Sequence, residues 1–351
     1  MMTKHTAADS ALFPTYARFP ITLVKGKGSK VWDDQGKEYL DFASGIAVTN
    51  LGHSPEPIRK RLAEQLEKLW HVSNLFHIPE QEKLGRLLAE SSGLDAAFFC
   101  NSGAEANEAA IKLARRYYQV VRGEARSEII TFRQSFHGRT LATLTATGQD
   151  KVKEGFAPLP EGFVYADWND ASSLKKVLSE RTCAVMMELV QGEGGVHPAD
   201  PAFVEEVAAF CKEHDLLLII DEIQTGMGRT GSLFAFQQYG IKPDIITLAK
   251  GLGSGFPIGA MLGTERLTEA FSPGSHGSTF GGNPLASVAG LATLEFMLEQ
   301  QLPERTRQRG DEMMQQLRER LAGLSWVKDV RGKGFLVGIE CSIEAADITA
   351  A

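Results

Sequence analysis

The stretch LLLIIDEIQTG, residues 216–226, places two acidic residues directly after a fully apolar run. A second stretch, IITLAKGLG at residues 245–253, repeats this arrangement with a lysine after the run. Continuous apolar runs of this length are typical of parallel strands that are buried on both faces. Side chains that follow the carboxyl ends of such strands point into the crevice where ligands bind. We therefore predict that Asp221 and Lys250 lie together at one edge of a parallel sheet.

The rest of the chain predicts an α/β fold with a large, mostly parallel sheet covered by helices on both faces. From residue 96 onward, short apolar runs alternate with segments of helical periodicity, a pattern typical of such folds. One predicted helix is opened by Asp200 and Pro201, a capping residue and a first-turn residue. The predicted strands span residues 96–100, 128–132, 162–166, 184–188, 216–220, 245–249 and 259–262.

The flanking segments predict a smaller α+β domain. In residues 22–42, two apolar segments are broken by DDQG, which predicts an antiparallel hairpin. A helix is expected from Glu56, and it would carry on one face Ile58, Leu62, Leu66 and Leu69.

Two helices and a glycine-bounded strand are expected after Pro284. We predict three regions: residues 1–55 in the small domain, 56–285 as the large domain, and 286–351 as the rest of the small domain. Because a domain begun with two helices and one strand should continue, we expect this last region to be incomplete at Ala351.

Composition narrows the classes of function. The 351 residues carry a net charge of −7 and no long basic run, so nucleic acid is not an expected partner. No apolar stretch approaches the ~20 residues of a membrane helix, and the N-terminus lacks the apolar core of a secretory signal. None of the four cysteines form a CxxC pair, which favours buried reduced thiols and a cytoplasmic location.

Lys250 and Asp221 together indicate pyridoxal phosphate (PLP). A lysine in an apolar, glycine-rich setting can lose its proton, act as a nucleophile that forms a Schiff base, and then act as a general base. A carboxylate nearby can keep the ring nitrogen of PLP protonated. The alternatives are a surface position for Lys250, and either a metal site or a solvated turn at Asp221 and Glu222. A metal site needs further ligands, and none occurs at a suitable spacing.

The segment CNSGAE, residues 100–105, follows a strand and opens a helix. Free N–H groups and the positive dipole end make such a helix start a natural phosphate cradle. Ser102 can add a hydroxyl group, and Gly103 allows close approach of the backbone. Taken alone, a simple helix cap is the better interpretation; the neighbouring Lys250 and Asp221 make a phosphate site the better one.

Three further segments supply candidate contacts. In SFHGRT, residues 135–140, Phe136 or His137 could stack on a planar cofactor or belong to the core, and the planar fork of Arg139 suits a carboxylate. A metal role for His137 is disfavoured because no second ligand has a suitable spacing. Gln224 could reach the phenolic oxygen of PLP, and Glu193 is either a functional carboxylate or a plain loop acid.

Six motifs occur in one order along residues 102–286: SGAEANEAAIKLAR, SFHGRT, QGEGGV, DEIQTGMGRTG, LAKGLGSGFPIGA and HGSTFGGNPLA. Together they resemble the class III PLP-dependent aminotransferases of fold type I, over roughly residues 25–341. Within the family, the chain is most similar to members that act on N-acetylornithine.

The resemblance implies a role for each motif. Lys250 would bind PLP and move a proton between substrate and cofactor, and Asp221 would pair with the ring nitrogen. The other implied cofactor contacts are Ser102, Gly103 and Ala104 at the phosphate, Phe136 on the ring, Gln224 at the ring oxygen, and Thr279 at the phosphate of a neighbouring subunit. Substrate contacts would come from Arg139, Ser278 and Glu193. A contact across subunits implies a homodimer with shared active sites, and relatives pair Glu193 with an arginine later than Ala351.

The implied reaction moves the δ-amino group of N2-acetyl-L-ornithine to 2-oxoglutarate, a step of arginine biosynthesis. Ile46 stands where ornithine aminotransferases usually have a tyrosine, which favours the acetylated substrate. Ornithine, succinylornithine and succinyldiaminopimelate remain alternative amino donors. An aminomutase or decarboxylase on the same fold is an alternative of another reaction class, and an inactive chain that lacks its C-terminal part is a third.

Overall fold

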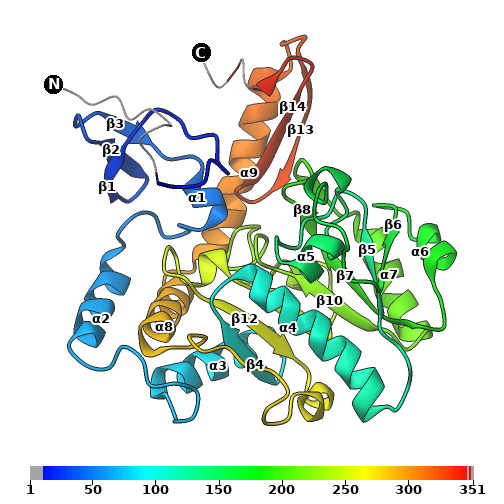
Figure 1. Ribbon diagram of the computed structural model, residues 1–351. Helices are drawn as coiled ribbons and strands as arrows, with labels where there is room; N and C mark the ends of the chain where they lie inside the picture. Colours follow the sequence, from blue (N-terminus) through cyan, green and yellow to red (C-terminus); the bar gives the residue numbers. More distant parts are fainter. Residues whose placement is uncertain (1–10, 346–347, 349–351) are drawn as a thin grey trace.

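A seven-stranded sheet forms the centre of the molecule in a computed structural model that describes residues 11–345 and 348 (Figure 1). Every predicted strand of the large sheet is present, and its ends lie within two residues of those expected. The strand order is β4-β12-β11-β10-β7-β5-β6. The strands are β4 (Ala96–Cys100), β5 (Glu128–Phe132), β6 (Phe163–Ala166), β7 (Thr182–Glu188), β10 (Leu217–Asp221), β11 (Ile245–Leu248) and β12 (Gly259–Gly263).

The sheet is mostly parallel, as predicted, because only β12 runs against its neighbours. It pairs antiparallel with both β4 and β11, whereas β11, β10, β7, β5 and β6 are mutually parallel. The register aligns Glu188 with Asp221 and Asp221 with Thr247. Three polar side chains therefore lie in a row where the central strands end.

Helices cover both faces of the sheet, and alternate residues of β10 show why. Leu218 and Ile220 belong to one hydrophobic cluster, and Leu217 and Ile219 belong to the other. The first cluster contains side chains of α3 (Pro79–Ser92), α6 (Ser172–Val177), α7 (Pro201–Glu213) and α8 (Pro284–Glu299). The second contains side chains of α4 (Gly103–Arg116) and of the π-helical turn η2 (Tyr117–Val121) that extends it.

Two small units lie beside the sheet (Figure 1). The predicted N-terminal hairpin is part of a three-stranded antiparallel sheet, β1 (Leu23–Lys27), β2 (Lys30–Asp33) and β3 (Glu38–Leu40). The second unit contains α9 (Leu302–Leu321) and a hairpin of β13 (Val327–Lys333) and β14 (Leu336–Cys341). The apolar pattern of the sequence predicts β14 but not β13, because VKDVRGK is too polar to give an apolar signal.

The helix from Glu56 ends at Leu66, so the prediction that its apolar face includes Leu69 was wrong. Helix α2 (Glu56–Leu66) packs on α8 through Ile58, which is buried beside Ala289 and Ala292. Leu66 and Leu69 are 46% and 48% exposed, and Leu69 lies past the end of the helix. The apolar spacing in the sequence therefore extends to Leu66 and Leu69, which lie beyond the part of α2 that is buried against α8.

The remaining elements are short. They are α1 (Ser44–Ala47), α5 (Leu141–Ala146), β8 (Val190–Gln191), β9 (His197–Pro198), η3 (Asp150–Val152), η4 (Ala235–Gln238), η5 (Lys250–Leu252) and η6 (Glu265–Ala270). The four cysteines are free thiols, and three of them are buried. Among the described helices, none combines the length and the apolar character needed to cross a membrane.

Candidate active site

A cavity of about 460 Å³ lies at the ends of the central strands and gathers most of the predicted site residues. Its walls include Lys250, Asp221, Ser102, Gly103, Ala104, Phe136, Gln224, Arg139 and Glu193. Ser278 is not part of this wall, but its Oγ accepts a hydrogen bond of 3.2 Å from the side-chain amide of Asn101, which does line the cavity. Thr279 is exposed and lies outside the cavity.

Lys250 comes two residues after β11 and begins η5. Its φ of +45° is unusual for a residue with a Cβ, so the surrounding structure must hold this conformation in place. Burial lowers the pKa of the Lys250 amine and outweighs the opposing charges of Asp221, Glu193 and Glu188. An amine that gives up its proton more readily than a solvated lysine is suited to act as a nucleophile and as a base.

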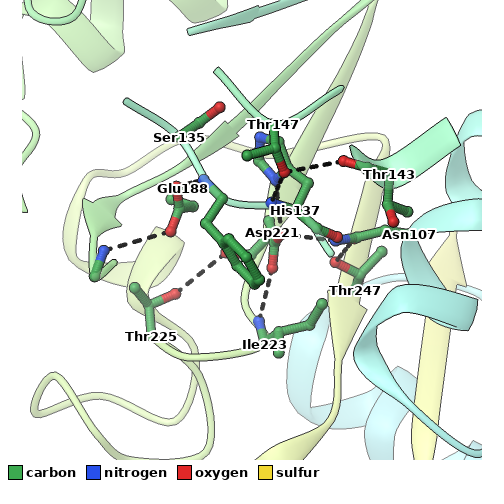
Figure 2. Close-up of polar contacts among 12 residues, drawn as sticks. Asn107, Ser135, His137, Thr143, Thr147, Glu188, Asp221, Ile223, Thr225 and Thr247 are labelled. Atoms are coloured by element: carbon green, nitrogen blue, oxygen red, sulfur yellow. Dashed lines mark hydrogen bonds and ion pairs between the residues drawn. The ribbon is translucent and has the colours of Figure 1, made fainter. Parts of the chain in front are cut away.

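The carboxylate of Asp221 has hydrogen-bond partners on both of its oxygens (Figure 2). Its Oδ1 accepts the backbone N–H of Ile223 at 3.0 Å. Its Oδ2 accepts a hydrogen bond from Asn107 Nδ2 at 2.8 Å and lies 2.8 Å from His137 Nδ1. Since the carboxyl group is only 4% exposed, these donors replace the water that would otherwise solvate its charge.

The structure separates the two aromatic candidates of SFHGRT. His137 is buried behind Asp221, and its backbone N–H donates to Thr147 Oγ1 at 2.9 Å. Burial by itself lowers the pKa of His137, but the hydrogen bond and charge of Asp221 outweigh it and leave that pKa raised. Both residues border the cavity, but Phe136 is partly exposed there, whereas the side chain of His137 is fully buried. The guanidinium carbon of Arg139 lies 5.6 Å from the centre of the Phe136 ring.

The start of α4 combines a helix cap with a free pair of backbone donors. Ser102 Oγ accepts the N–H of Glu105 at 3.3 Å, so its side chain acts as the cap that sequence analysis considered. Within residues 11–345 and 348, the N–H groups of Gly103 and Ala104 have no hydrogen-bond partner. A Cβ on Gly103 would lie 2.8 Å from the side chain of Ile223, which explains the glycine.

Glu188 connects two loops of the cavity. Its carboxylate accepts the backbone N–H of Phe136 at 3.0 Å and that of Gly192 at 3.4 Å. Burial raises the pKa of Glu188 to about 7. On the second loop, Glu193 Oε1 accepts a hydrogen bond of 3.4 Å from Gln224 Nε2. The buried carboxylate of Glu188 thus links the loop that contains Phe136 to the loop that contains Glu193.

These residues fit PLP, a cofactor with a phosphate, a flat ring with a basic nitrogen, and an aldehyde. The free N–H groups at the start of α4 suit the phosphate, and the aromatic face of Phe136 suits the ring. Asp221 offers a bonded carboxylate for the ring nitrogen, and Lys250 offers the amine for the aldehyde.

Asn107 and Glu188 are parts of this site that the sequence motifs did not predict, and the contact between His137 and Asp221 was not predicted either. A signal for Asn107 exists, because it is a polar residue on the otherwise apolar face of α4 that includes Ala106, Ala110 and Ile111. Glu188 ends an apolar run just as Asp221 does. The contact of His137 with Asp221 joins residues 84 positions apart, and no local pattern reveals it.

Comparisons with known proteins identify the family of this chain. The sequence matches the family model for class III aminotransferases over residues 13–351. It is 55% identical to the acetylornithine aminotransferase of Oceanobacillus iheyensis, over 98% of this chain and 86% of that protein. It is 57% identical to the acetylornithine aminotransferase of Halalkalibacterium halodurans, over 93% of this chain and 83% of that protein. Its fold is similar to that of the ornithine aminotransferase of Toxoplasma gondii crystallized with oxidized glutathione, whose active site is partially occupied by PLP. The TM-score is 0.93 with 33% identity, over 97% of this chain and 82% of that one.

Glu222, the residue after Asp221, should make stability depend on pH. It is fully buried and accepts hydrogen bonds from Thr225 Oγ1 at 2.7 Å and from the Phe236 N–H at 2.8 Å, and burial raises its pKa from 4.5 to about 7. The folded state therefore binds a proton more tightly than the unfolded state, so the free energy of unfolding should fall as pH rises from about 4.5 to 7. In Glu222→Gln this fall should shrink by roughly 1–3 kcal/mol.

Urea unfolding at pH 5 and pH 8 measures this difference. Glu206→Gln, a substitution of an exposed glutamate on α7, is the matched control and should keep the wild-type fall. An equal fall in wild type and Glu222→Gln would contradict the role given to Glu222.

Proposed function

Because this chain belongs to the class III aminotransferases and is a PLP-dependent transaminase, we propose that it moves the δ-amino group of N2-acetyl-L-ornithine to 2-oxoglutarate. The products are N-acetylglutamate 5-semialdehyde and glutamate. The observation that carries the substrate assignment is the identity of more than half of the residues with relatives named acetylornithine aminotransferase. The two substrates would use one site in turn, with the amino group held on the cofactor between them.

Bound PLP supplies an electron sink for the carbanion that forms when the substrate carbon loses a proton. We propose that the backbone of Gly103 and Ala104 holds its phosphate, with the hydroxyl of Ser102 at the edge. Phe136 would pack on the ring, Gln224 would face the ring oxygen, and Asp221 would hold the proton of the ring nitrogen. The free N–H groups of α4 support the phosphate contacts, and the buried carboxylate of Asp221, whose Oδ1 accepts one hydrogen bond, supports the contact with the ring nitrogen.

Lys250 has the central chemical role in the proposal. Its Nζ would hold PLP until the substrate amine arrives, and would then take the proton from the substrate carbon that bears the amino group. The lowered pKa of the buried amine supports both roles, since a neutral amine is needed for each.

Arg139 would hold a carboxylate of each substrate in turn. It lies in the wall of the cavity, and its planar fork suits a carboxylate group. Glu193, on the opposite loop, would change partners as the amino donor and the keto acid alternate, and Ser278 would contact the substrate from the rim. Ornithine, succinylornithine and succinyldiaminopimelate share the reacting end group, so they are the alternative donors to compare.

We propose that the active form is a homodimer with shared sites. Large apolar side chains in residues 12–76 are strongly exposed, including Phe13, Phe42 and Leu75 at 86–89%. A second copy of the chain would cover this apolar surface and remove it from water. The position of Thr279 outside its own cavity supports a contact with the PLP phosphate of the partner.

N-acetylornithine alone should convert the visible absorption of the PLP form to that of the pyridoxamine phosphate form. Adding 2-oxoglutarate should then restore the first spectrum and produce glutamate. We expect kcat/KM for N-acetylornithine to exceed that for ornithine by at least about tenfold, because the site would bind the acylated donor better. Release of carbon dioxide, or no spectral change with any of the acylated donors, would contradict the proposed reaction.

Arg139→Ala should raise KM for both N-acetylornithine and 2-oxoglutarate by about 10- to 100-fold, since each loses a charge-assisted hydrogen bond. The absorption of bound PLP should stay the same. Steady-state kinetics with each substrate varied in turn measure the effect. Arg133→Ala is the matched control, because Arg133 is exposed and pairs with Asp167. Unchanged KM values for both substrates would refute the role of Arg139.

Analytical ultracentrifugation should give a mass of twice 38.3 kDa for the wild type. Phe42→Glu should lower the dimer fraction, because burying an unpaired carboxylate in the interface is unfavourable. Val120→Glu, on the exposed side of η2, is the control and should leave the dimer intact. A monomeric wild type would overturn the proposal of shared sites.

A further inference from the structure

We infer that Asn107 is a positioning residue that holds four separate parts of the PLP site in register. This inference rests on the cofactor-binding roles proposed above, and it assigns Asn107 a task that none of the sequence motifs indicated. Asn107 lies in the second turn of α4, and its side chain is completely buried.

The side chain of Asn107 makes three hydrogen bonds to three other segments (Figure 2). Its Nδ2 donates to Asp221 Oδ2 at 2.8 Å and to the backbone oxygen of His137 at 2.7 Å. Its Oδ1 accepts the hydroxyl of Thr247 at 2.7 Å. Both amide hydrogens and the amide oxygen are therefore used, which leaves no polar atom of this buried group unsatisfied.

The partners of Asn107 fix the orientation of its amide group. The two groups facing Nδ2 are a carboxylate and a carbonyl, which can only accept hydrogen bonds there. If the amide were rotated by 180°, its oxygen would face two acceptors in a buried site, which costs free energy. The hydroxyl of Thr247 donates to the opposite end of the amide and favours the same orientation.

Each segment that Asn107 connects carries a proposed contact of PLP. Gly103 and Ala104, at the start of its own helix, would bind the phosphate. His137 is next to Phe136, which would pack on the ring, and Asp221 would pair with the ring nitrogen. Thr247 on β11 precedes Lys250 by three residues. The amide of Asn107 thus connects the segments proposed to contact the phosphate, the ring and the ring nitrogen of PLP, and the segment that carries Lys250. It can therefore set the relative positions of these segments before PLP binds.

A purely structural role is the simpler alternative, and it has a weakness. Asparagine is a poorer helix former than alanine by a few tenths of a kcal/mol, and Ala106, Ala109 and Ala110 surround it on α4. If Asn107 served only to pack α4, alanine or leucine at this position would pack the helix equally well. The amide of Asn107 instead donates a hydrogen bond to the buried carboxylate of Asp221, which neither alanine nor leucine could do. This contact indicates that asparagine is needed for the site.

The experiment compares PLP binding with apoprotein stability in four variants. Apparent PLP dissociation constants come from absorbance titration of apoprotein, and melting temperatures are measured without PLP. We expect Asn107→Leu, which removes all three hydrogen bonds and keeps the number and branching of side-chain heavy atoms, to weaken PLP binding by about tenfold or more. Thr247→Val, a milder change, should weaken it by about threefold and leave the apoprotein melting temperature within about 3 °C of wild type.

Thr293→Val is the matched control for Thr247→Val. Thr293 is equally buried, but its hydroxyl donates to Ala289 O within α8, away from the site. PLP affinity should be unchanged in this variant. If Asn107→Leu does not fold, the comparison of the two threonine variants still decides the inference.

Asn107→Asp gives a signature that a packing role would not produce. Its carboxyl group would face two acceptors, Asp221 Oδ2 and His137 O, so it must share a proton to replace the lost N–H groups. The ratio of its PLP dissociation constant to that of wild type should therefore rise with pH between 6 and 9. His137, Glu188 and Lys250 are the other titratable groups around this position, and the wild type measured over the same pH range gives their contribution without the added carboxyl group.

The inference is overturned if Thr247→Val binds PLP as tightly as Thr293→Val, or if the Asn107→Asp ratio does not change with pH. Lower melting temperatures with unchanged PLP affinity would show a structural role only. These measurements need no amino donor, so they stand apart from the choice of substrate. A wild type that binds PLP but rejects N-acetylornithine would refute the proposed reaction and leave the test of Asn107 valid.

Discussion

The buried carboxylate of Asp221 is the constraint on which the site depends. A charge removed from water must be met by hydrogen-bond donors, and the fold provides them from the backbone of Ile223 and from the side chains of Asn107 and His137. These donors come from the loop after β10, from α4, and from the loop after β5. Satisfying one charge therefore brings together the segments that surround the cavity.

The strand register prepares this arrangement. Glu188, Asp221 and Thr247 are aligned on β7, β10 and β11, so the strand pairing alone places these three residues side by side. Lys250 follows the last of these strands in a strained conformation, with its amine buried near several carboxylates. Burial favours the neutral amine and the carboxylates favour the charged one. Burial is the larger of the two effects, so the pKa of the Lys250 amine is lowered.

Much of the fold could be read from local patterns, and the exceptions have physical reasons. The strands of the large sheet are apolar runs, because both of their faces are covered, and such runs are visible in the sequence. The polar strand β13 carries no such signal, and it forms because β14 offers it a partner. The end of α2 could not be placed either, because the apolar spacing does not show where the surface of α8 ends.

By itself the sequence determined the α/β class, the strands of the large sheet, and most of the side chains that line the cavity, including Lys250, Asp221 and Arg139. These follow from apolar periodicity and from residue types at strand ends and helix starts, which are local properties. Only the tertiary structure decided that His137 supports Asp221 while Phe136 faces the cavity, and that Asn107 joins α4 to β10 and β11. Such contacts join residues far apart in the chain, and their partners are chosen by packing and by the need to satisfy buried charge.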